Sequence, residues 1–404
     1  MLDVLEAERE RTLALVAPLP AEQLEAQPDP IMSPLVWDLA HIAAYEDLWI
    51  NHRHGRRPLL RPDVAAYYDA FETPRAVRGS IEILDAAAAR GYLAEVRDRS
   101  AETIERRGGG ELVELVLRHE LQHRETMLQT LQLTRPPGYD PERPPLPERA
   151  PGPTGLERVE VPGGAFVLGA GNGAFAYDNE RPAHRLELST FAIGRTPVTN
   201  ASFLSFVEGG GYERRTLWTE EAWQWKEQYD ITHPMGWTGD GREWRMGRPV
   251  PLHATAPVVH VSWFEAAAFA RFCGARLPTE AEWEKAATWD QETQATRPPA
   301  PEHANLDQTD FGPRPPVAES VSPAGCLAML GDVWEWTSSA FGGYPAFRAH
   351  PYREYSEVFF GRGYHVLRGG SWATARRVAT PTFRNWDLPQ RRQIFAGVRL
   401  AWDA

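Results

Sequence analysis

The chain has 404 residues, of which 42% are hydrophobic and 24% charged, as in an ordinary globular protein. Because one hydrophobic core usually stops growing at roughly 250–300 residues, we expect two domains. The net charge of −12 argues against nucleic acid or an anionic membrane as a partner and favours small-molecule substrates. No window reaches the roughly 18 apolar residues of a membrane span, and no signal-peptide run opens the chain. A soluble cytoplasmic protein is therefore expected, with Cys273 and Cys326 as buried small hydrophobes rather than a redox pair.

Residues 1 to about 134 have a helical pattern. Apolar residues recur near helical spacing in four segments, residues 5–19, 33–52, 84–107 and 111–133. Four amphipathic helices predict a bundle. The proline-marked segment 55–79 is too long for a simple turn, so we expect it to cross the bundle as an ordered loop.

A proline-rich stretch then marks a domain boundary. Residues 135–154 cannot continue a helix and predict a semi-rigid linker between a bundle of residues 1–134 and a second domain of residues 155–404. Downstream the pattern changes to short β-type runs, many Gly and Trp residues, and one or two helices. The β-type runs include residues 165–170, 184–194 and 258–263, and the helices residues 263–274 and 279–289. This pattern predicts an α+β domain with much irregular backbone.

Three histidines of the helical half are candidate metal ligands. His119 and His123 lie four residues apart, which places them one turn apart on the same helix face, close enough to bind one ion. His41 lies among apolar residues of the second helix, where an unpaired imidazole would be costly to bury. A bundle interior is where such residues converge on a metal. Three neutral imidazoles suit iron, zinc or copper, with water completing the sphere.

Other interpretations of this region stay open at this point. Two histidines at this spacing also fit a solvated helix surface. A site with two histidines and one carboxylate would use Glu46 or Glu120. Glu125 lies off the face of the histidine pair. The remaining histidines lack such placement, and two of them lie in the basic stretch "NHRHGRR", which we interpret as a solvated loop, namely His52 and His54.

The motifs of both halves resemble one known family. "MSPLVWDLAHI" (32–42) and "HELQHRETML" (119–128) are similar to the DinB-type bundle of the ergothioneine-pathway sulfoxide synthases, the EgtB family. "GGAFVLGA", "TPVTNASFLSF", "LPTEAEWEKAA", "GDVWEWTSS" and "VLRGGSW" resemble the formylglycine-generating-enzyme type of C-type-lectin-like domain, which forms the second half of those enzymes. The order of the halves and the C-terminal "FRNWDLPQRRQIFAGVRLAWD" match as well. The resemblance covers nearly the whole chain and implies a multi-domain α and α+β fold, a DinB-like four-helix bundle followed by a C-type-lectin-like α+β domain.

The resemblance implies a mononuclear non-haem Fe(II) enzyme. Such an enzyme uses O2 to join a thiol sulfur to the imidazole C2 of hercynine and to oxidise the sulfur to a sulfoxide. Its iron ligands would be His41, His119 and His123, and the thiol of the actinobacterial type would be γ-glutamylcysteine. Three neutral ligands leave open positions at the ion, which a catalytic metal needs.

Substrate contacts also follow from the resemblance. Gln122, Asn385 and Trp386 would contact hercynine, because its quaternary ammonium favours aromatic faces and its carboxylate favours donors. γ-Glutamylcysteine calls for guanidinium groups plus one acid. These would come from a set that we call the thiol clamp, Arg75, Arg78, Asp387 and Arg391. Solvated charges are the alternative interpretation of the arginines. The family also uses a tyrosine as proton donor, for which Tyr344, Tyr352 and Tyr355 are candidates, although tyrosines in such a loop are also packing anchors.

One position departs from the family pattern. Directly after the second bundle histidine, where an acidic residue is expected, this chain has Arg124. If Arg124 faced the cleft, a different donor would be favoured, such as the selenosugar used by the related selenoneine synthases. The thiol clamp favours the dipeptide, because a neutral sugar does not need it. Further alternatives are a zinc-dependent DinB-type thiol transferase and a lectin-like binding module with a vestigial bundle.

Overall fold

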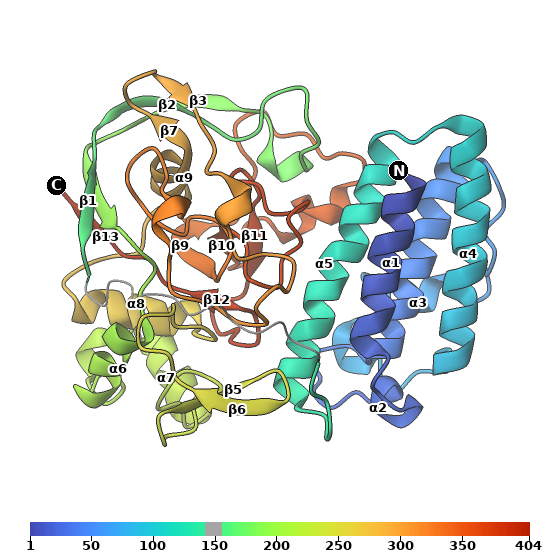
Figure 1. Cartoon of the computed structure of the whole chain (residues 1–404), viewed down its shortest axis with the longest axis horizontal. Helices are drawn as coiled ribbons and strands as arrows, with labels where there is room; N and C mark the ends of the chain where they lie inside the picture. Colours follow the sequence, from blue (N-terminus) through green and yellow to red (C-terminus); the bar gives the residue numbers. More distant parts are fainter. Residues whose placement is uncertain (142–155) are drawn as a thin grey trace. The chain divides into compact units, whose positions relative to one another are not determined.

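In the computed structural model the chain divides into two compact units, residues 1–142 and 143–404 (Figure 1). The structure describes residues 1–141 and 156–404. Most of the predicted linker, residues 135–154, therefore lies outside the described residues. Within the described ranges, no helix is both long and apolar enough to cross a membrane.

The first unit is helical, as the apolar periodicity predicts. Its long helices lie side by side, and a π-helix, η1, directly continues α3 (Figure 1). The elements are α1 (Leu2–Val16), α2 (Ala21–Glu25), α3 (Leu35–Glu46), η1 (Asp47–His54), the 3₁₀ turns η2 (Ala65–Tyr68) and η3 (Arg75–Val77), α4 (Ala86–Arg107) and α5 (Glu111–Thr134). The four predicted helices correspond to α1, α3 with η1, α4 and α5, and the short α2 is additional.

Local signals explain where the two longest helices begin and end. The Asp85 side chain accepts a hydrogen bond from the Ala88 backbone N–H at 2.7 Å and caps α4. That helix ends at Gly108, whose φ of 77° favours glycine. Helix α5 ends at Arg135 in the left-handed conformation, directly before two prolines. These limits leave His119 and His123 near the middle of α5, on a rigid element.

A buried ionic network joins the four long helices. Arg9 of α1 donates to Glu120 of α5 and to Glu46 of α3, each at 2.8 Å. Arg97 of α4 donates to Glu46 at 2.9 Å and to Glu120 at 3.3 Å. All four side chains are buried. Two guanidiniums face two carboxylates, so the network has no net charge, and each helix contributes one member.

The segment 55–79 is ordered against the bundle, as predicted. The Trp37 indole N–H donates to the Tyr67 carbonyl at 2.9 Å, and the Tyr68 hydroxyl accepts from the Leu84 backbone N–H at 2.7 Å. The prediction of a loop at His52 and His54 was wrong, because helical hydrogen bonding continues through η1 as far as His54.

The second unit is α+β, as predicted. Its strands are β1 (Arg158–Val161), β2 (Gly164–Leu168), β3 (His184–Leu188), β4 (Phe191–Gly194), β5 (Arg242–Arg245), β6 (Arg248–Pro251), β7 (Trp289–Asp290), β8 (Ala295–Thr296), β9 (Trp334–Ala340), β10 (His365–Arg368), β11 (Asn385–Asp387), β12 (Ala396–Gly397) and β13 (Ala401–Asp403). Its helices are α6 (Asn200–Glu208), α7 (Glu220–Gln228), α8 (Trp263–Phe272) and α9 (Glu280–Thr288). Short 3₁₀ turns, η4 to η9, lie between them, at Asp178–Glu180, Arg215–Leu217, Pro301–His303, Ala318–Ser320, Arg353–Tyr355 and Glu357–Phe359.

Two sheets organise this unit. One has the order β1-β4-β13 and the other β11-β10-β9-β12, and three two-stranded sheets pair β2 with β3, β5 with β6 and β7 with β8. Strands β1 and β13 both pair antiparallel with β4, so segments far apart in the sequence complete one sheet. Helix α9 packs on the core through Trp283, which is fully buried and donates to Glu335 at 2.6 Å.

Two predictions for this unit need correction. Residues 258–263 do not form a strand, because His260 has a φ of 63° and Ser262 caps helix α8. One or two helices were expected, whereas the described residues contain four, of which α8 and α9 were predicted.

Cys326 is buried, Cys273 is half-buried, and both are free; burial raises the pKa of each thiol to about 11.

Candidate metal centre and substrate-contact residues

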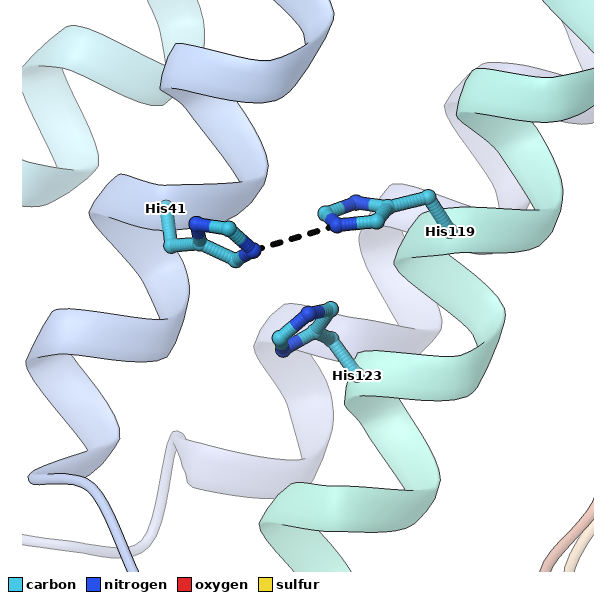
Figure 2. A group of neighbouring side chains, drawn as sticks. All are labelled: His41, His119 and His123. Atoms are coloured by element: carbon cyan, nitrogen blue, oxygen red, sulfur yellow. Dashed lines mark hydrogen bonds between the residues drawn. The ribbon is translucent and has the colours of Figure 1, made fainter. Parts of the chain in front are cut away.

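Three histidine side chains point toward one another in the helical unit (Figure 2). His41 comes from α3, and His119 and His123 come from α5. One nitrogen of each lies within 4.8 Å of the others. The Nε2 atoms of His41 and His119 are 3.1 Å apart. The predicted convergence of these histidines is confirmed.

Backbone and carboxylate acceptors fix two of these rings. The Nδ1–H of His41 donates to the Tyr68 carbonyl at 2.6 Å, since a carbonyl oxygen can only accept. The Nδ1–H of His123 donates to the Asp38 carboxylate at 3.1 Å for the same reason. Each ring therefore keeps its Nε2 lone pair for the centre of the cluster.

Aromatic side chains stack on two of the histidine rings and limit their rotation. Trp37 stacks on His41 with ring centroids 4.7 Å apart and planes at 14°. Tyr45 stacks on His119 with centroids 3.6 Å apart and planes at 7°. Both aromatic residues belong to α3, so this helix supplies one histidine of the cluster and supports a second.

Burial keeps two histidines of the cluster neutral. Burial, and then the nearby His123, lower the pKa of His41 well below its ordinary value. Burial, followed by the neighbouring His123 and His41, does the same for His119. A low pKa means that both imidazoles are unprotonated at neutral pH, which is the form that binds a metal.

The geometry fits a divalent transition metal. Two nitrogen ligands at about 2.1 Å from one ion, separated by a right angle, lie about 3.0 Å from each other. The observed 3.1 Å between the Nε2 atoms of His41 and His119 agrees with that value. Three neutral nitrogen donors suit iron, zinc or copper, and they leave coordination positions for other molecules.

The alternative with a carboxylate ligand was wrong. Glu46 and Glu120 do not join the histidine cluster, because their oxygens accept from Arg9 and Arg97 in the buried ionic network.

Arg124, the position that departs from the family pattern, faces another helix. It is buried and forms an ion pair with Glu8 of α1 at 2.5 Å, so its guanidinium is directed at α1 and is neither outward-facing nor part of the histidine cluster.

Arg78 is a fixed positive charge beside the histidines. It is buried, and its guanidinium donates to the Thr73 carbonyl, the Ser33 hydroxyl and the Ala70 carbonyl at 3.0, 2.7 and 3.4 Å. It also lies 3.5 Å from the centroid of the Trp37 ring. Burial lowers its pKa to about 10.

The other predicted contacts of the first unit lie near the same cluster or on its helices. Arg75 is exposed, with its guanidinium 3.5 Å from the Ile31 carbonyl. The charges of Arg78 and Arg75 contribute to lowering the pKa of His41, so both guanidiniums are close enough to act on that ring. Gln122 is half-buried on α5, directly before His123.

The predicted contacts of the second unit lie on or just after β11. Asn385 caps its own strand by accepting from the Trp386 backbone N–H at 2.9 Å. Trp386 stacks on Phe341 with centroids 4.2 Å apart and planes at 7°. Asp387 lies 3.8 Å from the Arg391 guanidinium in a partly exposed pair. These four predicted residues are therefore neighbours on one strand and the turn after it.

The three tyrosine candidates lie in two environments. Tyr344 is buried in a hydrophobic cluster, and its hydroxyl donates to Glu280 at 3.4 Å, as in a packing anchor. Tyr355 packs edge-on against Trp386 at 5.9 Å, and Tyr352 packs against Tyr355 at 6.2 Å. Tyr352 and Tyr355 are thus brought toward the predicted hercynine contact, and Tyr344 is held in the core.

Sequence reasoning missed Asp38. Its signal was present, since an acid three residues before His41 in an otherwise apolar helix shares the face of that histidine. Its partner His123 is 85 positions away, and no local pattern connects the two.

Comparison with known families matches both halves. Residues 4–127 match the DinB superfamily, and residues 143–404 match the sulfatase-modifying factor enzyme 1-like domain. The chain is therefore a DinB-type helical unit followed by a formylglycine-generating-enzyme-type α+β domain, as the motifs predict.

Full-length relatives narrow this class further. The chain is 44% identical to the hercynine oxygenase of Mycolicibacterium smegmatis, covering 100% of this chain and 98% of the relative. It is 46% identical to that of Mycolicibacterium thermoresistibile, with coverages of 98% and 93%, and 45% identical to that of Mycobacterium tuberculosis, with coverages of 98% and 96%. The chain belongs to the hercynine oxygenase family, a family of oxidoreductases, and the predicted family is confirmed.

Proposed function

We propose that this chain is an Fe(II)- and O2-dependent sulfoxide synthase that joins hercynine to γ-glutamylcysteine. The observation that carries the proposal is the three-histidine cluster, found in a chain that aligns over its full length with hercynine oxygenases. Open coordination positions around such a cluster suit chemistry that must gather two substrates and O2.

The reaction balances with one O2 and no further reductant. The thiol loses its S–H hydrogen and hercynine loses the hydrogen on C2 as the C–S bond forms, which releases two electrons. Oxidation of the sulfur to the sulfoxide releases two more. O2 accepts all four electrons, with one oxygen atom in the sulfoxide and the other leaving with the two hydrogens as water.

Within this proposal the bundle residues hold and tune the metal. His41, His119 and His123 bind it as neutral ligands. When bound, iron would supply thiol acidification and O2 activation. The backbone carbonyl of Tyr68 and the carboxylate of Asp38 hold their imidazoles in one tautomer, so the ligand set is preorganised before substrates arrive.

The remaining predicted residues are proposed to bind the two substrates. Gln122, Asn385 and Trp386 would contact hercynine, with an aromatic face for its quaternary ammonium. The thiol clamp would take the charged ends of γ-glutamylcysteine, with Arg75 and Arg78 for carboxylates and Asp387 for the ammonium, aided by Arg391. Two guanidiniums close enough to act on His41 favour an anionic substrate at the metal over a neutral sugar. Tyr352 or Tyr355 is favoured over Tyr344 as the proton donor, because both lie in the aromatic group around Trp386.

Mass spectrometry of the products tests the proposal. The Fe(II)-loaded chain is given hercynine and O2 with γ-glutamylcysteine, cysteine or a selenosugar in parallel. A sulfoxide adduct formed with γ-glutamylcysteine in preference to the others supports the proposal. A carbon–selenium product alone would move the chain to selenosugar chemistry, and full turnover with zinc in the absence of O2 would exclude an oxygenase.

A variant of the thiol clamp tests the donor assignment separately. Arg75→Ala should raise the KM for γ-glutamylcysteine by about 10–100-fold, because a hydrogen bond to a charged group contributes about 1.5–3 kcal/mol. The KM for hercynine should stay constant. Arg53→Ala, an exposed arginine of η1, is the matched control. Equal effects of the two substitutions would remove Arg75 from the thiol site.

A further inference from the structure

Asp38 is a buried acid in contact with the histidine cluster. It lies on α3 three residues before His41, so that both side chains share one face of the helix. It is 1% exposed. One of its oxygens, Oδ1, accepts from the Nδ1–H of His123 on α5 at 3.1 Å. Asp38 therefore connects the two helices that carry the metal ligands.

This hydrogen bond determines what His123 offers to the cluster. A neutral imidazole has one N–H and one lone pair, and the carboxylate captures the N–H on Nδ1. The lone pair is then on Nε2. Because the bond also fixes the orientation of the ring, the His123 ring centroid lies 4.5 Å from both His41 and His119.

Burial of Asp38 also carries a cost for the stability of the fold. Its second oxygen, Oδ2, is buried without a hydrogen-bond partner in the described part of the chain. A buried polar atom without a partner costs about 1–3 kcal/mol, and more when the group is charged. A side chain selected only for packing would avoid that cost. The cost is compatible with a role that needs the negative charge.

The surroundings of Asp38 explain why a negative charge is useful there. Imidazole ligands bind a metal in their neutral form, so a bound dication would keep its full charge, and Arg75 and Arg78 add two positive charges near His41. The attraction between Asp38 and the Arg78 guanidinium opposes the lowering of the Arg78 pKa by burial. Asp38 thus places a carboxylate among positive groups that would otherwise repel a cation.

We infer that Asp38 is a positioning residue of the metal centre, which holds His123 with its Nε2 toward the metal and offsets the positive charge of the site. The inference rests on the metal site of the proposed function and is independent of the thiol donor. It predicts a loss of metal affinity in variants of a residue that is not itself a ligand.

Two measurements test the inference on the full-length chain. The first is the affinity for Fe(II) alone under anaerobic conditions, by competition with a chromophoric chelator. Asp38→Ala should weaken binding by about 10–100-fold, as is usual when an outer hydrogen-bond partner of a ligand is removed. Asp38→Asn keeps an oxygen that can accept the same bond, so its loss should be smaller than that of Asp38→Ala. The second is ¹⁵N NMR of the His123 ring in the metal-free chain, assigned with a His123→Asn sample. The ring should be protonated on Nδ1 in the wild type and a mixture of tautomers in Asp38→Ala.

Asp47→Asn is the matched control, because Asp47 is also a buried acid of the same helical segment but accepts from the Leu60 backbone N–H and the Arg99 guanidinium. It should reduce stability and leave both readouts unchanged. An Fe(II) affinity within twofold of wild type in a folded Asp38→Ala chain, with His123 still protonated on Nδ1, would overturn the inference. A wild-type chain that bound no metal would instead overturn the proposed function, and the NMR comparison would still decide the role of Asp38 in holding the ring.

Discussion

The buried ionic network leads to a quantitative prediction for Glu120→Ala. In the wild type, Arg9 and Arg97 face Glu46 and Glu120, and the four charges cancel. The substitution leaves two buried guanidiniums opposite one carboxylate. Breaking a buried pair in this way typically costs about 3–5 kcal/mol. That is a large fraction of the roughly 5–15 kcal/mol by which a domain is stable, so the helical unit should be severely destabilised.

Hydrogen exchange is the suitable assay, because it reports the opening free energy of the helical unit by itself in a chain with two units. Amides in the middle of α1, α4 and α5 should lose about 3–5 kcal/mol of protection in Glu120→Ala, whereas amides of α9 should not change. Glu102→Ala is the control, since Glu102 forms an exposed pair with Arg57 and should cost under about 1 kcal/mol.

A compensating double variant checks the electrostatic reasoning. Replacing one guanidinium and one carboxylate together, as in Arg9→Met with Glu120→Leu, restores charge balance and should recover most of the loss. The reasoning would be refuted by a folded Glu120→Ala chain that loses less than about 1 kcal/mol of protection in these helices, or by a double variant that is no more stable than the single one.

Three further predictions follow from the metal centre and the second unit. His119→Ala should abolish both metal binding and turnover, whereas the exposed His52→Ala should change neither; retained metal stoichiometry in the former would exclude the three-histidine site. Burial lowers the pKa of His41 and His119, so at acid pH the unfolded chain binds more protons than the metal-free folded chain. Helices α3 and α5 should therefore lose protection in hydrogen exchange as the pH falls below about 6.5, without a comparable loss in α9. Gly331→Ala should lower the Tm far more than Gly361→Ala. Both glycines have positive φ, but a Cβ at Gly331 would lie 2.3 Å from the Asn305 carbonyl oxygen. Equal shifts in Tm would contradict this reason.

The helical half was predictable because its signals are local. Apolar spacing located α1, α3, α4 and α5, and the i, i+4 spacing of His119 and His123 put them on one face. The third ligand, His41, could be proposed because a histidine among apolar residues needs a partner. The family motifs then joined the three residues into one site.

What the sequence did not reveal depends on partners far away along the chain. Glu46 and Glu120 are excluded as metal ligands by their ion pairs with Arg9 and Arg97, which come from other helices. The hydrogen bond between Asp38 and His123 crosses 85 positions.

In the second unit, two helices were overlooked although each has a threonine cap, Thr199 before α6 and Thr219 before α7. The β-branched side chains of residues 258–263 favour a strand, but the Ser262 cap begins helix α8 there. In these segments the helix caps carry information that apolar periodicity alone does not.

The sheet of β1, β4 and β13 has a consequence for synthesis of the protein. Ile193 of β4 pairs with Ala401 of β13, and 401 − 193 gives a separation of 208 residues. At about 5–20 residues per second, a ribosome needs roughly 10–40 s to make that interval. During this time one edge of β4 has no native neighbour, and an unpaired edge can pair with another chain. The nascent second unit is thus most exposed to aggregation before its last strand emerges.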